Sequence, residues 1–132
     1  MKMDLIEMTT LRKKDSGLPV NIFIDDSISY KRQRHPKGVV FQNNESSFVL
    51  MTLDGKVVEK TLPVKLKITS RDIEQVRNFV LNNAECLSLV ADFDLDYDYF
   101  KYHLMIPGGE LATKEQRLAQ KELLNEYLNG AP

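Results

Sequence analysis

The first half of the chain alternates apolar and polar positions with the two-residue period of β-strands. Residues 18–24 and 39–41 are rich in β-branched and aromatic side chains, and residues 4–11 precede a turn-forming segment. Residues 64–68 alternate apolar and basic side chains, which is typical of a strand with one solvent-exposed face. We therefore expect an antiparallel sheet of about five strands within residues 4–69.

The clearest local signal in this half is a hairpin. Two β-prone runs, residues 47–53 and 56–62, are separated by Asp54 and Gly55. Asp-Gly favours a hairpin because a type I′ turn needs positive φ at both of its central residues. Pro63 cannot donate a hydrogen bond to a neighbouring strand, so we expect the second strand to end there.

The second half changes to the three- and four-residue spacing of helices. Thr69 to Asp72 has the pattern of a capping box. Asn82 and Asn83 fit a second cap, so one helix and two consecutive helices with a bend both stay open. We expect an apolar stripe on this segment to pack against the sheet, at Ile73, Val76, Val80, Ala84 and Leu87. The strand-rich half is expected to contribute Ile22, Ile24, Val40, Leu50 and Leu66 to the same core.

The last third of the chain contains a segment that fits two kinds of secondary structure and a separate predicted helix. Residues 92–100 fit either a strand, by alternation, or a helical face, and we favour a helix over residues 95–104. Thr113 to Gln116 is a second capping-box pattern, which predicts a last helix over residues 113–128. That helix has few apolar residues, so it packs loosely, swaps onto a neighbour or becomes ordered on a partner.

Length and composition fit one globular domain. The chain has 132 residues, of which 42% are hydrophobic and 28% charged, so a core forms without disulfides or a structural metal. We predict one α+β domain over residues 1–132, strand-rich over 1–69 and helical over 70–132. The helices of residues 70–129 are expected to pack on one face of the sheet.

Cysteine usage and hydropathy indicate the compartment. Cys86 is the single cysteine, which excludes an intrachain disulfide and suits a reducing cytoplasm. Its apolar neighbours favour packing in the core over a role as a reactive thiol. Residues 1–5 lack the apolar segment of a signal peptide, and no stretch approaches the roughly 18 apolar residues of a membrane helix. We expect a cytoplasmic protein with no membrane partner.

Charge is divided unevenly along the chain. Residues 1–69 carry 12 basic and 8 acidic side chains, for +4, whereas residues 70–132 carry 6 and 11, for −5. Such a split fits a polyanion-binding face, attraction between the two halves of one fold, or a dimer that pairs front to back.

The densest charge is a basic loop, which we define as residues 31–37. Its candidate anion- or nucleic-acid-binding residues are Lys31, Arg32, Arg34, His35 and Lys37. Lysine and arginine clusters bind phosphate backbones, and Tyr30 and Phe41 flank the loop and stack on bases if they are exposed. The alternative is a solvated loop that pairs with the acidic half of the chain.

Motifs for catalysis, metals and cofactors are weak. Neither calcium-loop spacing at the aspartates of residues 92–98 nor zinc-ligand spacing at the histidines is present, and we predict no metal and no cofactor. One enzyme hypothesis remains, because Asp25 or Asp26 together with Asp54 and Lys56 loosely resembles the pattern of metal-dependent restriction-type nucleases. In that family the carboxylates hold Mg²⁺ and the lysine helps to activate water. The Asp-Gly turn explains the same residues without catalysis.

Three segments, residues 18–24, 69–73 and 82–87, resemble small uncharacterised bacterial domains in which strands precede a helix that ends near an Asn-rich bend. The resemblance spans about residues 18–95 and implies a bacterial or mobile-element origin. It implies no activity and no site residues.

These observations favour a non-enzymatic interaction module that self-associates or binds another protein. Exposed strand edges and the polar last helix supply its surfaces. The alternative is a weak nucleic-acid-binding accessory protein that uses the basic loop, and a metal-dependent nuclease comes third.

Overall fold

The computed structural model describes residues 9–24, 37–44, 47–61 and 68–130. Within these residues five strands form one antiparallel sheet, in which each strand pairs with the next along the chain. This arrangement confirms the predicted sheet. The strand predicted at residues 64–68 lies outside the described residues except for Ile68, which is buried and is not in a strand. The strands are β1 (Thr9–Leu11), β2 (Asn21–Ile24), β3 (Gly38–Asn44), β4 (Ser47–Thr52) and β5 (Val57–Thr61).

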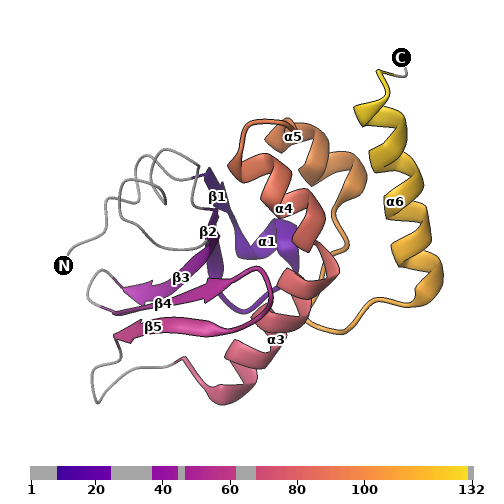
Figure 1. Ribbon diagram of the computed structural model, residues 1–132. Helices are drawn as coiled ribbons and strands as arrows, with labels where there is room; N and C mark the ends of the chain where they lie inside the picture. The colour runs from indigo at the N-terminus through magenta and orange to yellow at the C-terminus, as the bar shows by residue number, and fades with distance from the viewer. Residues whose placement is uncertain (1–8, 25–36, 45–46, 62–67, 131–132) are drawn as a thin grey trace.

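Helices dominate the rest of the described chain, and α3 and α4 lie on one face of the sheet, as expected for an α+β fold (Figure 1). A single helical turn, α1, replaces the turn predicted before β2. The last helix, α6, stands at the edge of the molecule, away from the sheet. The helical elements are α1 (Lys13–Ser16), α3 (Ser70–Asn82), α4 (Ala84–Ala91), α5 (Tyr97–Tyr99), the π-helical turn η2 (Phe100–Leu104) and α6 (Lys114–Leu128).

Both predicted capping boxes are present. The Thr69 hydroxyl accepts a hydrogen bond from the Asp72 backbone at 3.1 Å, and the Asp72 carboxylate accepts one from the Thr69 backbone at 3.0 Å. Thr113 and Gln116 make the same reciprocal pair at the start of α6. Each box satisfies two backbone N–H groups that a helix start leaves unpaired, which fixes where α3 and α6 begin.

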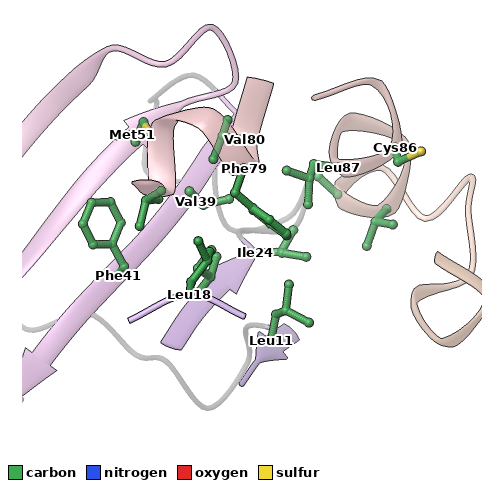
Figure 2. Close-up of a cluster of buried hydrophobic side chains, with 14 of the residues drawn as sticks. Leu11, Leu18, Ile24, Val39, Phe41, Met51, Phe79, Val80, Cys86 and Leu87 are labelled. Atoms are coloured by element: carbon green, nitrogen blue, oxygen red, sulfur yellow. The ribbon is translucent and has the colours of Figure 1, made fainter. Parts of the chain in front are cut away.

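The core lies between the sheet and the helices (Figure 2). Val39, Phe41, Val49 and Met51 face α3 and α4 and are fully buried. The expectation that Val40 and Leu50 share this core is wrong, because they form a second buried cluster with Phe23 and Phe48. The physical reason is the two-residue period of a strand, which points Val40 and Leu50 to the face opposite their neighbours.

The hairpin between β4 and β5 is present, but its turn differs from the predicted type I′. Gly55 N–H donates to the Thr52 carbonyl at 2.9 Å, so Leu53 and Asp54 occupy the central positions. Asp54 does not have positive φ, whereas Gly55 follows at φ +88°. A three-residue loop closed by a left-handed glycine is the next most common hairpin connection. A separate register shift follows further along the two strands, between Leu50 and Met51.

Helix α4 ends in a Schellman motif that has phenylalanine where glycine is usual. Phe93 N–H donates to the Val90 carbonyl at 3.1 Å, and Asp94 N–H donates to the Leu89 carbonyl at 2.9 Å. Phe93 has φ +63°, in the left-handed region that costs residues with a Cβ about 1 kcal/mol. Its ring is largely exposed, so little packing offsets that cost.

Replacing this residue tests the motif. We expect Phe93→Gly to raise the free energy of unfolding by up to about 1 kcal/mol, because glycine reaches positive φ without steric cost. Urea unfolding monitored by circular dichroism measures the change. Phe93→Ala is the control, since it removes the same ring but keeps the Cβ. A glycine variant no more stable than the alanine variant would contradict the expectation.

Candidate functional site

Of the predicted binding residues, only Lys37 lies within the described part of the chain. Its ammonium group donates to the Ser88 hydroxyl at 2.9 Å and forms an ion pair with the Asp92 carboxylate. Lys31, Arg32, Arg34 and His35 lie outside the described residues. The structure therefore brings one end of the basic loop to the start of the acidic 92–98 segment, which sequence spacing could not establish.

The position of this contact has a simple electrostatic explanation. Asp92 is the C-cap of α4, where the helix dipole gives partial negative charge. A lysine at this point is attracted by both the carboxylate and the helix end. The Lys37 charge is thus engaged within the fold, and the nucleic-acid alternative stays a prediction that depends on residues 31–36.

The aromatic contribution predicted for Phe41 is wrong. Phe41 lies on the helix-facing side of β3 and is 0% exposed, so its ring packs in the core and is not available to stack on a base. The two-residue period again gives the reason, because Ile22 and Val49, its partners on the neighbouring strands, are buried on the same face.

The residues of the nuclease hypothesis have structural roles where they are described. The Asp54 carboxylate accepts hydrogen bonds from the Thr52 hydroxyl and from the Lys56 backbone, and these bonds hold its pKa below the usual value. The Lys56 ammonium lies 4.0 Å from the same carboxylate at an exposed loop tip. Asp25 and Asp26 lie outside the described residues. Turn geometry accounts for Asp54, and nuclease activity stays an untested prediction.

The four aspartates of the 92–98 segment have separate surroundings. Asp92 pairs with Lys37, Asp96 caps α5 by accepting from the Tyr99 backbone at 3.0 Å, and Asp94 and Asp98 are exposed. Across the described ranges, no group of three or more His, Cys, Asp or Glu side chains is arranged to hold a metal ion.

Cys86 packs in the core, as predicted. It is 0% exposed, and burial, with a smaller contribution from Glu85, raises the pKa of its thiol to about 12. The unfolded chain loses the thiol proton at a lower pH than the folded chain. The free energy of unfolding is therefore unaffected by this group below its ordinary pKa of 9.0 and falls as the pH rises from there toward about 12.

This burial predicts slow chemistry at Cys86. We expect an aromatic disulfide reagent at neutral pH to label the native chain at least about 100-fold more slowly than the chain unfolded in urea, because labelling requires opening of the core. The absorbance of the released thiolate measures both rates. Comparable rates in the two states would show that the thiol is accessible in the folded chain.

Two buried asparagines at the α3–α4 junction bind the segment that leads to α6. Asn82 donates to the Glu110 carbonyl at 2.7 Å and accepts from the Ala112 backbone at 2.9 Å. Asn83 accepts from the Ile106 N–H and donates to the Ile106 carbonyl, both at 2.9 Å. Of the two alternatives left open by the sequence, two consecutive helices are present, and Asn83 stands at the N-cap position of α4. Its side chain makes no cap bond there and instead bridges to Ile106, 23 residues later.

Helix α6 is attached to the body by one narrow stripe. Gln120 donates to the Asn83 side chain at 2.9 Å and to the Leu104 carbonyl at 3.0 Å. Leu124 is 1% exposed, and Tyr127 stacks on Tyr99 with ring centroids 4.6 Å apart. In the structure of the single chain, the last helix therefore packs on its own body through this stripe.

The opposite side of α6 is open to solvent. Leu118 is 56% exposed, and every charged side chain of the helix is exposed. Large apolar side chains with substantial exposure gather on this helix and just before it, at Leu111, Leu118, Leu123 and Leu128. We call the side of α6 centred on Leu118 the outer face.

No helix in the described ranges has the length and apolar character needed to cross a bilayer. Comparison with known proteins found no family model, no curated protein and no solved structure that matches this chain. The arguments for function therefore rest on the residues described above.

Proposed function

We propose that this chain is a non-enzymatic protein-interaction module of the cytoplasm and that α6 carries its contact surface. The attachment of α6 supports this most directly. All 15 residues of α6 are described, and among them only Leu124 is fully buried. Gln120 and Tyr127 lie beside it and complete the stripe that faces the body. A helix that rests on one narrow stripe leaves most of its surface for a partner.

Two further properties of α6 support a docking role. Its start is fixed by a capping box and its position by the Asn83–Gln120 contact, so the helix is ordered before any partner binds. Binding then does not have to order the helix, which lowers the entropic cost of association. On the outer face the exposed Leu118 side chain lies between charged side chains, which is the arrangement of an apolar contact with a polar rim.

Site-specific photo-cross-linking tests the proposal. A photoreactive amino acid in place of Leu118 is expected to give discrete protein adducts when the full chain is irradiated in cells. The matched control places the same amino acid at Val58, which is 51% exposed on β5, compared with 56% for Leu118. No discrete adduct from position 118, or the same adducts from both positions, would contradict a contact surface on α6.

A further inference from the structure

We infer that the partner of the outer face is a second copy of this chain and that the two α6 helices pair in parallel. This inference rests on the proposed function, since it names the occupant of the same surface. The observation that carries it is the placement of charge around α6, which is complementary to itself only in the parallel orientation.

The outer face has a central line and two flanks. Leu118 and Asn125 are seven residues apart, or almost two helical turns, so they lie on one line along the helix. The charged side chains of one flank are all basic, and the charged side chains of the other flank are all acidic. The basic flank consists of Lys114, Arg117 and Lys121, and the acidic flank consists of Glu115, Glu122 and Glu126.

This segregation does not stabilise the helix by itself. Pairs three or four residues apart have like charge, as in Arg117 with Lys121 and Glu122 with Glu126, and such pairs destabilise an isolated helix. None of the six charged side chains forms an ion pair with another residue of the described chain. The separation of basic and acidic side chains onto two flanks instead fits binding to another surface that also has one basic flank and one acidic flank.

Symmetry decides the orientation of a second copy. When a two-fold axis runs parallel to the helices, the basic flank of each helix faces the acidic flank of the other. When the axis is perpendicular, acidic flanks face each other and basic flanks face each other, which is unfavourable. Asn125 would meet its own counterpart in the parallel pair, and two amide side chains can donate to and accept from each other.

The shape of the molecule leaves room for this pairing. Gln120, Leu124 and Tyr127 hold the body on the side of α6 opposite to Leu118. The helix also lies at the edge of the molecule (Figure 1). In a parallel pair, the body of each copy would therefore lie on the side of its α6 that faces away from the other copy. The two outer faces could then meet without a clash between the bodies.

A charge-swap experiment tests the inference. The acidic variant carries Lys114→Glu, Arg117→Glu and Lys121→Glu, and the basic variant carries Glu115→Lys, Glu122→Lys and Glu126→Lys. Neither set touches the stripe that faces the body, and circular dichroism checks that both variants fold. By sedimentation velocity at low ionic strength, we expect the wild type to associate and each variant alone to lose association by at least about tenfold. An equimolar mixture of the two variants is expected to form the one-to-one pair again.

The outcomes separate this inference from the proposed function. A mixture that stays monomeric, or a single variant that associates as strongly as the wild type, overturns pairing between two copies. If the mixture fails while the photoreactive group at position 118 still captures a different protein, the contact surface stands and its occupant is wrong. If position 118 captures nothing, both conclusions fail. The wild type gives a readout that needs no variant, because its association should weaken as salt screens the flanks.

Discussion

Replacing Asn83 with alanine is expected to lower the free energy of unfolding by about 3 kcal/mol, a large part of the stability of a domain this size. The amide is 0% exposed and makes contacts with α3, with Ile106 and with Gln120. Its removal leaves the Ile106 N–H and carbonyl buried without their partner, and each unpaired group carries a desolvation penalty. The change also releases one of the contacts that position α6.

Urea unfolding measures this loss of stability. Asn78→Ala is the control, because it removes the same side-chain amide from a position with fewer contacts. Asn78 donates a single part-buried hydrogen bond to the Gly109 carbonyl at 3.0 Å, so its loss should cost only about 1 kcal/mol. If the two variants lose the same stability, the Asn83 contacts do not hold the junction together as described.

The second large effect is expected at Gly38, the first residue of β3. A Cβ atom built on this glycine would lie 2.2 Å from the Met51 carbonyl oxygen, which belongs to the paired strand and cannot rotate away. Gly38→Ala should therefore force β3 and β4 apart locally and lower the free energy of unfolding by about 3 kcal/mol. The same shift would disturb Lys37, the neighbouring residue, and its pairing with Asp92.

Gly130→Ala separates this steric effect from a purely conformational one. A Cβ at Gly130 meets no atom within 4 Å, but the residue has φ +73°. Its replacement should cost only the backbone penalty of about 1 kcal/mol. Thermal unfolding of the two variants compares the costs, and equal losses would show that the close approach at Gly38 is not limiting.

Local signals predicted much of the fold. The capping boxes at Thr69 and Thr113 and the Asp54-Gly55 hairpin each satisfy backbone groups within a few residues, so their pattern is visible in sequence. The predicted type I′ turn was wrong because the same Asp-Gly sequence fits two kinds of loop. In one the glycine is the second central residue of the turn, and in the other it follows the two central residues. The assignment of Val40 and Leu50 failed because adjacent apolar residues in β3 and β4 are buried on both faces, where alternation alone does not identify the core face.

The candidate site was harder to predict because it depends on contacts between distant segments. Asn83 meets residues 106 and 120, and Lys37 meets residue 92, and no local pattern encodes those pairings. The charge flanks of α6 are different, since they follow from helical spacing once residues 114–128 are known to be a helix. What the structure adds is which side of that helix faces the body and which side is free.

The central claim is that two copies meet through the outer faces of parallel α6 helices, and oxidative cross-linking tests it most directly. A cysteine in place of Leu118 would lie near its own counterpart in a parallel pair, within the short distance that a disulfide requires. The native Cys86 is buried and should not compete. Mild oxidation of Leu118→Cys is expected to give a 118–118 disulfide dimer, whereas Val58→Cys, of matched exposure, stays monomeric. No dimer from position 118 beyond that of the control would contradict the claim.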